Sequence, residues 1–492
     1  MINATLVGVA LTAILALTRW RWGIFLCVLV GLLQDPLRKL APDQPVFFVV
    51  LVGVVFGGTW IGASLAKVRL VPSSMIGWKQ HMGMPFRLFV ALVLAQAFHT
   101  LFRHGTPMMA AVGLMVWLAP ILAVVLAYQW AARRSLPGVR GWMMFYCAAA
   151  MVSLTGVYLQ YLGFAWPSLG EVGPGLIIYD VGRALKAYSG FFRSSEIAAW
   201  HTATIGAFAF ILFTARRLSG LRLAAAVAFL AVLVTLGLLT GRRKMLVEMA
   251  LFVGTYVVLV AWFRHHSIRQ ALIAGALGLV AWGTVVVMVD PESATRSRRQ
   301  EYEAEVEGFR GYQARGASAF SEIPNRFMQM GVAPVGWAVD NFGFFGAGLG
   351  TGAQTGSGRE EKRIVDAGAA EGGVGKITQE LGIPGLILVG WLGIGMARYL
   401  FRVLTFTTRT SLPHARVAYG LLALLLAKVA SFSVAAQVYS DLFVLLIMGW
   451  SLGFLLAMPG LAARAQAQRL AAAEPAPQHA LLPHRGQPAW AR

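Results

Sequence analysis

Three adjacent cations interrupt an apolar region near the middle of the chain. The segment LGLLTGRRKMLVEM (residues 237–250) holds Arg242, Arg243 and Lys244 in a short turn between two apolar stretches. Arginine binds phosphate through its planar, bidentate guanidinium group, and lysine adds a compact positive charge. The turn is therefore a candidate site for a phosphate or another anion. The alternative is that these side chains only anchor membrane helices.

Two carboxylates flank the start of an apolar stretch late in the chain. The segment AAEGGVGKITQELGIPGL carries Glu371 and Glu380, with Lys376 between them. A carboxylate in a fixed position can remove a proton from a hydroxyl group. We therefore take Glu371 as a candidate general base, and Glu380 and Lys376 as candidate substrate contacts. For both carboxylates, a salt bridge or a helix-end charge is the structural alternative.

A second polar cluster, YSGFFRSSEIAAWHTATIG, opens another apolar stretch. Arg193 and Glu196 are three residues apart, so they can pair on one face of a helix. His201 follows five residues later and is either a hydrogen-bonding partner for another helix or a substrate contact. All three are candidate substrate-binding residues; the alternative for Ser194-Ser195-Glu196 is a helix cap. No pair of histidines has the spacing of metal ligands, so we predict no metal site and no cofactor.

The composition identifies the elements that must position these residues. Of the 492 residues, 58% are hydrophobic and 13% are charged, whereas soluble domains are about 25% charged. Repeated apolar stretches of roughly 18 to 25 residues match a bilayer core about 30 Å thick. We therefore predict an all-α, polytopic membrane protein with 12 or 13 spans. They are expected near 3–18, 22–37, 45–65, 86–102, 107–129, 140–163, 197–214, 222–240, 245–263, 269–289, 376–400, 415–434 and 441–458.

Loop charges orient these spans, because lysine and arginine favour cytoplasmic loops. Basic loops follow the third, fifth, seventh, ninth and eleventh expected spans, which puts the N-terminus outside. The cationic turn at 242–244 then faces outward, against the general trend; a topology displaced by one span is the alternative. The net charge of +21 is spread along the chain and does not indicate nucleic-acid binding. Cys27 and Cys147 lie in apolar stretches and are expected to pack there.

A long outward segment, residues 290–375, is expected to form a solvated domain. Thirteen of the chain's 21 acidic residues lie between 290 and 380. Its glycine-rich part, NFGFFGAGLGTGAQTGSG, permits close backbone approach to a ligand; the alternative is a flexible surface loop. The predicted organisation is thus a bundle of about ten spans (1–289), this loop domain, three last spans (376–458) and a disordered cytoplasmic tail (459–492).

Five short motifs occur in order along nearly the whole chain: GLLQDPLRKLAPDQP, GFFRSSEIAAWHTA, GRRKM, GAGLGTGA and EGGVGKITQELGIPGL. Together they resemble the O-antigen ligase and O-antigen polymerase-like superfamily of bacterial envelope glycosyltransferases. The resemblance implies a metal-independent enzyme of the inner membrane, with its active site at the periplasmic face. It implies a glycan donor on undecaprenyl diphosphate, a glycan acceptor and contacts with membrane lipids. Polysaccharide export or chain-length-control proteins are further candidate partners.

The resemblance also assigns roles to single residues. The external arginines of the family match Arg242 and Arg243, which would bind the donor diphosphate beside Lys244. A family arginine on a helix of the large loop corresponds to either Arg326 or Arg310.

One position departs from the pattern of the ligases in this superfamily. Ligases carry a histidine nine residues before the glutamate of an ExG motif. Here that motif is Glu380-Leu381-Gly382, and the position nine residues earlier is Glu371. The departure favours a polymerase of exopolysaccharide or O-antigen repeat units over an O-antigen ligase.

Two classes of protein other than an enzyme remain open. A transporter of lipid-linked glycans would also need outward cations and a charged cavity. Transporters often contain internal repeats and interrupted helices, and the sequence shows no repeat. The charges nearest to a deep position in the expected spans are Glu248, Lys428 and Asp441. A structural subunit of a secretion complex is the third reading, which the outward charge clustering disfavours.

Overall fold

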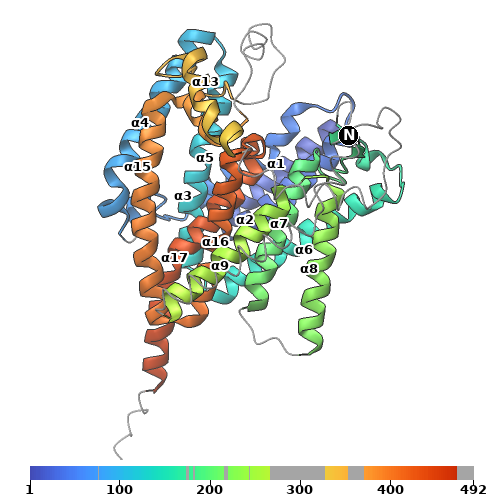
Figure 1. Cartoon of the computed structure of the whole chain (residues 1–492). Helices are drawn as coiled ribbons and strands as arrows, with labels where there is room; N and C mark the ends of the chain where they lie inside the picture. The colour runs from blue at the N-terminus through green and yellow to red at the C-terminus, as the bar shows by residue number, and fades with distance from the viewer. Residues whose placement is uncertain are drawn as a thin grey trace, which may run out of the picture.

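The apolar stretches of the chain form a bundle of long helices (Figure 1). The computed structural model describes residues 1–75, 77–172, 177–180, 183–214, 220–242, 244–265, 327–352 and 371–473. Within this part, ten helices are long and apolar enough to cross a membrane. The prediction of a helical, multi-pass membrane protein is confirmed. The expected span at 269–289 and most of the loop at 290–375 lie outside the described residues.

The twelve other expected spans each coincide with a helix. Those in the first half are α1 (Ile2–Thr18), α2 (Trp20–Leu40), α3 (Leu51–Leu65), α4 (Trp78–His104), α5 (Pro107–Ala132), α6 (Leu136–Tyr161), α7 (Ser195–Thr214), α8 (Leu221–Leu239) and α9 (Lys244–His265). Those in the second half are α15 (Gly373–Thr410), α16 (Leu412–Val434) and α17 (Leu442–Ala473).

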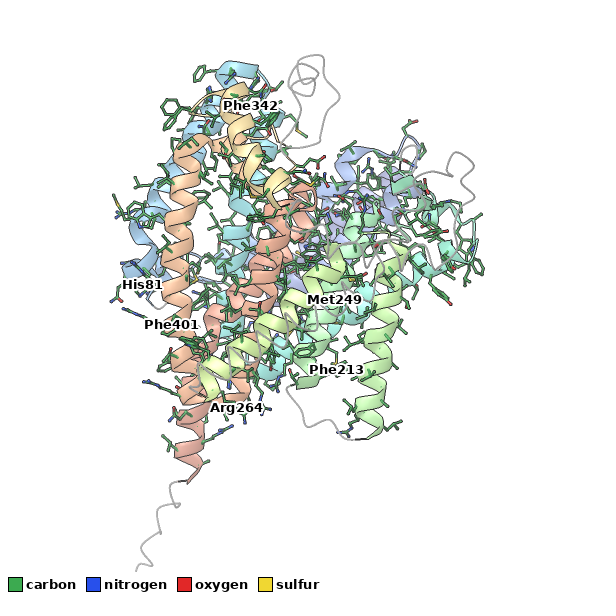
Figure 2. The ribbon with its side chains drawn as sticks, viewed as in Figure 1. His81, Phe213, Met249, Arg264, Phe342 and Phe401 are labelled. Carbon is green, nitrogen blue, oxygen red and sulfur yellow. The ribbon has the colours of Figure 1, made fainter. Side chains whose placement is uncertain are left out.

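Short elements complete the described chain. They are η1 (Val46–Val50), η2 (Pro72–Ser74), η3 (Pro167–Leu169), the strands β1 (Ile177–Asp180) and β2 (Arg183–Lys186), the π-helical turn η5 (Phe327–Val332), α13 (Ala333–Phe342) and the 3-10 turn η6 (Gln437–Ser440). The two strands form an antiparallel hairpin in which Ile177 pairs with Lys186. Figure 2 shows Phe342 of α13 near the upper end of the bundle and Arg264 of α9 at the lower end.

The C-terminal helix corrects one boundary. Disorder was expected from residue 459 onward, but α17 continues to Ala473. The sequence LAARAQAQRLAAA in this extension is rich in alanine, glutamine and arginine, which are strong helix formers. The expectation of disorder is therefore wrong for residues 459–473, and residues 474–492 lie outside the described residues.

Small residues allow α17 to pack closely on α5 in the centre of the bundle. Gly449 and Gly453 are four residues apart on α17. A Cβ atom at Gly449 would lie 2.6 Å from the carbonyl oxygen of Pro120, and one at Gly453 would lie 2.4 Å from that of Val124. Small residues at this spacing bring membrane helices close enough for extensive van der Waals contact. The pair α5–α17 is thus tightly packed.

Helix α15 is interrupted after its first turns. Gly382 has φ 69° and ψ −171°, a conformation that favours glycine, and Pro384 follows it. The amide of Ile383 donates to the carbonyl oxygen of Phe344 at 2.9 Å. A Cβ atom at Gly382 would lie only 2.4 Å from that oxygen. The break therefore accommodates the glycine-rich segment 343–352.

That segment is held by side chains of its neighbours. Gln96 of α4 donates to the carbonyl oxygen of Phe345 (2.8 Å), and Thr100 donates to that of Leu349 (3.2 Å). The amide of Gly352 donates to Oε1 of Glu380 (3.1 Å). Irregular backbone between membrane helices requires such partners, because lipid supplies none. Residues 343–352 are therefore a fixed part of the fold, which excludes the flexible-loop alternative for them.

A buried ion pair joins α9 to α16. The ammonium of Lys428 contacts a carboxylate oxygen of Glu248, and neither side chain is more than 4% exposed. Lys428 also donates to the carbonyl oxygen of Trp200 on α7 (3.2 Å) and lies 4.0 Å from the centre of that indole ring. Lys428 therefore connects three helices at one point.

We expect Lys428→Met to destabilise the protein by about 3 to 5 kcal/mol, because it leaves Glu248 buried without its partner. The double variant Lys428→Met/Glu248→Leu should regain most of that loss, since a buried pair can be replaced by apolar side chains at little cost. Thermal and denaturant unfolding in detergent measure both variants. A single variant as stable as the native chain would contradict this role for the pair.

Candidate functional site

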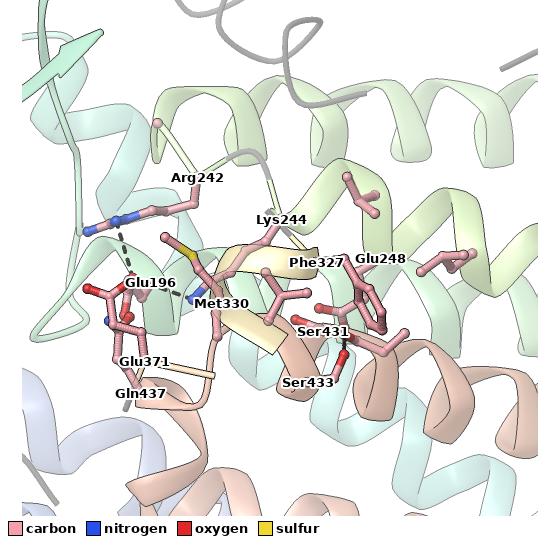
Figure 3. A pocket seen from close by; sticks show the side chains of 16 residues that line it. Glu196, Arg242, Lys244, Glu248, Phe327, Met330, Glu371, Ser431, Ser433 and Gln437 are labelled. Carbon is pink, nitrogen blue, oxygen red and sulfur yellow. Dashed lines mark hydrogen bonds and ion pairs between the residues drawn. The ribbon is translucent and has the colours of Figure 1, made fainter. Parts of the chain in front are cut away.

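A cavity of about 450 Å³ lies between the start of α7, the α8–α9 turn, α9, α16 and the segment that leads into α15 (Figure 3). Its polar and charged lining consists of Glu196, Arg242, Lys244, Glu248, Glu371, Ser431, Ser433 and Gln437. The remaining wall is mostly apolar and comes mainly from α9, α16 and η5. It includes Val247, Leu251, Phe327, Met330, Ala430 and Val434. The cavity thus joins a charged part to an apolar part, as an amphipathic ligand requires.

The turn that carries Arg242 is built by the end of α8. Gly241 adopts φ 66°, in the left-handed region that commonly ends a helix at glycine. The hydroxyl of Thr240 donates to the carbonyl oxygen of Gly237 (2.6 Å). Helix α9 then begins at Lys244. The cations therefore lie in a tight turn between α8 and α9. The two apolar stretches form the helices, and Gly241 permits the turn between them.

Arg242 and Lys244 converge on one carboxylate, that of Glu196 in the first turn of α7. Nη1 of Arg242 lies 3.2 Å from Oε1 of Glu196, and Nζ of Lys244 lies 3.4 Å from the same oxygen. Nε of Arg242 donates to Oγ of Ser195 at 3.0 Å. With its amide nitrogen facing Glu196, Gln437 donates to both carboxylate oxygens at 3.0 and 3.1 Å. Figure 3 shows the two cations reaching Glu196 from the α8–α9 turn.

The site keeps its positive charge despite partial burial. Burial lowers the pKa of the Arg242 guanidinium from its ordinary value, and the nearby Glu196 carboxylate offsets part of this effect. Arginine nevertheless stays protonated at neutral pH, because its ordinary pKa is far above 7. The cavity therefore presents a permanent cation together with Lys244.

Glu371 lines the same cavity from the start of α15. Its backbone is fixed, since its carbonyl oxygen accepts a hydrogen bond from the amide of Ala436 (2.7 Å). Gly372 follows, and a Cβ atom there would lie 1.7 Å from the carbonyl oxygen of Met330. The Glu371 side chain is exposed, and among the described residues it forms no ion pair. A fixed backbone thus carries a solvent-accessible carboxylate.

Arg193 of the second polar cluster has other partners than expected. Arg193 pairs with Asp35 (3.2 Å) and Asp441 instead of Glu196. The predicted pairing is wrong because α7 begins at Ser195, so Arg193 lies in the preceding turn. The two carboxylates outweigh the effect of burial and raise the pKa of Arg193 above its ordinary value. This residue joins α2 to the start of α17 and does not line the cavity.

His201 is fully buried one to two turns below the start of α7. Its Nδ1 and the hydroxyl of Tyr146 are hydrogen-bonded at 2.7 Å, and its ring stacks on Phe192 with the centroids 4.8 Å apart. These contacts agree with the interpretation of His201 as a partner of another helix.

Lys376 and Glu380 are also buried. Lys376 donates to Oγ of Ser440 (2.6 Å), while Oε2 of Glu380 accepts from Nε1 of Trp117 (2.7 Å). With Gly352 on its other oxygen, Glu380 is occupied by protein contacts, so its geometry fits the structural alternative. Three further predicted residues lie outside the described residues, namely Arg243, Arg310 and Arg326.

The turn η6 and the residue after it connect the cavity to the rest of the bundle. Gln437 contacts Glu196, the Tyr439 hydroxyl donates to the carbonyl oxygen of Lys428 (2.8 Å), and Ser440 accepts from Lys376. Asp441 pairs with Arg193. Sequence reasoning missed Gln437, Ser431 and Ser433. Their only signal was a run of polar residues closing the apolar stretch of α16.

The arrangement suits an anion better than a metal ion. Its ordered donors are the N–H groups of Arg242, Lys244 and Gln437, whereas a metal ion needs a set of converging acceptors. Among the described residues, no group of three His, Cys, Asp or Glu side chains could hold a metal ion.

Comparison with protein-family models gives no match to this chain, and comparison with curated protein sequences gives none either. The class of protein therefore follows from the fold and the site alone. The chain is a multi-pass helical membrane protein with a charged, partly apolar cavity at the ends of its helices.

Proposed function

We propose that this chain is a glycosyltransferase of the bacterial inner membrane. It polymerises oligosaccharide repeat units that are linked to undecaprenyl diphosphate, at the periplasmic face and without a metal ion. The observation that carries the proposal is the cavity in which Arg242 and Lys244 accompany the accessible carboxylate of Glu371. The ordered motifs described above, from GLLQDPLRKLAPDQP to EGGVGKITQELGIPGL, support the same conclusion.

Three helix ends add to the attraction of a diphosphate. Glu196 lies in the first turn of α7, Lys244 is the first residue of α9, and Glu371 stands two residues before α15. The N-terminus of each helix carries a partial positive charge of roughly half a unit. Helix N-termini bind phosphate groups through their free amides and this charge. The cavity therefore combines two side-chain cations with three favourable helix ends.

The apolar wall supports a donor with a lipid tail. Val247 and Leu251 follow Lys244 along one face of α9, and Ala430 and Val434 line the cavity from α16. Spacings of three and four residues place side chains on the same helix face. A diphosphate at Lys244 would thus have apolar surface next to it, running toward the membrane interior.

The residues account for the chemistry of transfer. Glu371 takes the proton of an acceptor hydroxyl, whose oxygen forms a bond to the anomeric carbon of the donor. The bond between that carbon and the diphosphate oxygen breaks, and its electron pair leaves with the lipid diphosphate. Arg242 and Lys244 stabilise the negative charge that grows on this leaving group. Glu371 is exposed, so an acceptor glycan reaches it from water.

Transport of the same lipid is the second candidate function, because α15 is interrupted at Gly382, as transporter helices often are. That break, however, lies only nine residues after the start of the helix, and the carbonyl oxygen of Phe344 occupies it. An interruption near a helix end, filled by the chain's own backbone, fits a rigid scaffold better than an alternating gate.

The test uses the purified full-length chain in detergent with a lipid-linked repeat unit of known structure. A ladder of lengthened glycans on the lipid is expected. Transfer of a whole glycan to a lipid core, but no lengthening, would identify a ligase instead. Movement of the intact lipid across a vesicle membrane without any new glycosidic bond would identify a transporter.

The proposed orientation makes a separate prediction. With 13 spans and a periplasmic domain at 290–375, a cysteine at Thr355 should react with an impermeant maleimide in intact spheroplasts. A cysteine at Ser135, between α5 and α6, should react only after lysis. The native Cys27 and Cys147 are both buried, which keeps the background low. Reaction at 135 with protection at 355 would reverse the orientation.

A further inference from the structure

The proposed anion site already contains an anion of the protein. Oε1 of Glu196 lies 3.2 Å from Arg242 and 3.4 Å from Lys244, so both cations use the same oxygen. A diphosphate in this cavity would have to approach the same two groups. Glu196 is therefore either a support that arranges the cations or a competitor of the ligand.

The geometry distinguishes these roles in part. Nε of Arg242 donates to Oγ of Ser195, a buried side chain that holds the guanidinium without help from Glu196. Lys244 is the first residue of α9, so the helix fixes its backbone. Arg242 thus keeps a side-chain partner without the carboxylate, and Lys244 keeps the position of its backbone.

Gln437 also holds the carboxylate itself. When its amide nitrogen faces Glu196, Gln437 donates to the two carboxylate oxygens at 3.0 and 3.1 Å. Gln437 belongs to η6, whose neighbour Ser440 is tied to α15 through Lys376. Glu196 therefore keeps a partner on η6 when the cations turn toward a ligand, and it stays within reach to pair with them again.

We propose that Glu196 is an internal competitor for the diphosphate, and that it speeds release of the spent lipid diphosphate by re-pairing with Arg242 and Lys244. This inference rests on the proposed function. Without such a competitor, two cations and three helix ends would retain a multiply charged product. Competition by Glu196 thus lowers the affinity of the site for the diphosphate, so that binding stays reversible.

The test measures binding of inorganic pyrophosphate to the purified full-length chain in detergent, by calorimetry. Glu196→Gln keeps the shape and the contact with Gln437 but removes the charge. We expect it to bind pyrophosphate roughly tenfold more tightly, because the ligand no longer has to displace a charged carboxylate from Arg242 and Lys244. One hydrogen bond to a charged group contributes about the free energy of a tenfold change in affinity. In steady-state transfer the same variant should have a lower KM and a lower kcat, with an initial burst of product.

Glu371→Gln is the matched control for binding, because it removes another carboxylate from the same cavity that has no described cation partner. Its affinity for pyrophosphate should change less than twofold. Weaker pyrophosphate binding by Glu196→Gln would show that Glu196 positions the cations, and unchanged binding would show that it does not compete. Either result would overturn the proposal. Equal tightening by both variants would show a general charge effect and overturn it as well.

Failure of the proposed function has a different signature. In that case neither the native chain nor Glu196→Gln would bind pyrophosphate, and Arg242→Ala would change nothing. If Arg242→Ala abolishes pyrophosphate binding but Glu196→Gln does not tighten it, the diphosphate site is supported and only the competition by Glu196 is wrong. Circular dichroism and thermal unfolding of each variant verify that the helices remain intact.

Discussion

Replacement of Glu371 by glutamine is expected to reduce glycan transfer by about 10²- to 10⁴-fold, because the amide cannot accept the proton of the acceptor hydroxyl. The level of the protein in the membrane should not change, since the side chain is exposed and its backbone contact to Ala436 is retained. The assay is the length distribution of glycans formed from a lipid-linked repeat unit. Glu371→His is the informative second variant: partial activity would show that the carboxylate takes the role of the ligase histidine.

Asp340→Asn is the control for Glu371→Gln. Asp340 is an exposed residue near the end of α13, the helix that follows the turn η5, and it does not line the cavity. It should leave the product ladder unchanged. Full-length polymer from Glu371→Gln at normal protein level would remove Glu371 from the mechanism.

Replacement of Arg242 by alanine is expected to lower transfer by about 10²- to 10³-fold, the typical loss when one stabilising donor of a developing anion is removed. Arg242→Lys should restore little, because an ammonium group cannot copy the bidentate guanidinium. Initial rates at saturating and at limiting donor separate the effects on kcat and on kcat/KM.

Arg264→Ala supplies the comparison, because Arg264 is an exposed arginine near the opposite end of α9. It should behave like the native chain. The neighbouring Arg243 is the sequence-based alternative for the same role, so Arg243→Ala belongs in the same series. An inactive Arg243→Ala beside an active Arg242→Ala would transfer the role to Arg243, and two active variants would leave anchoring as the function of the turn.

The ten long apolar helices were predictable because the bilayer sets a minimum length and an apolar composition for every crossing helix. The ends of the helices were less predictable. Helix α4 begins at Trp78, about two turns before the expected start at 86, and α17 continues well past 458. Both extensions lie where amphipathic or alanine-rich sequence continues a helix beyond the apolar core. Hydropathy marks the apolar core of a helix, whereas propensity and packing determine where the helix ends.

The candidate site was predictable only where unusual residues gather locally in the sequence. Arg242, Lys244 and Glu371 stand out against apolar surroundings, and the structure brings all three into one cavity. Partners from distant segments were not predictable. The carboxylate of Asp35 accepts from Arg193, 158 residues away, and Glu196 is held by Gln437. Such pairings depend on how the helices assemble, which residue spacing does not encode.

The short connection between α16 and α17 has a consequence for how the chain tolerates changes in length. Only residues 435–441 join these helices, and the contacts of Gln437, Tyr439, Ser440 and Asp441 reach three helices (α7, α16 and α15) and the loop before α7. One inserted or deleted residue would rotate all four side chains away from their partners together. Insertions are usually tolerated best in exposed loops that hold few contacts. The connection at 435–441 therefore acts as a fixed-length spacer, and its residue number is as constrained as the identity of its side chains.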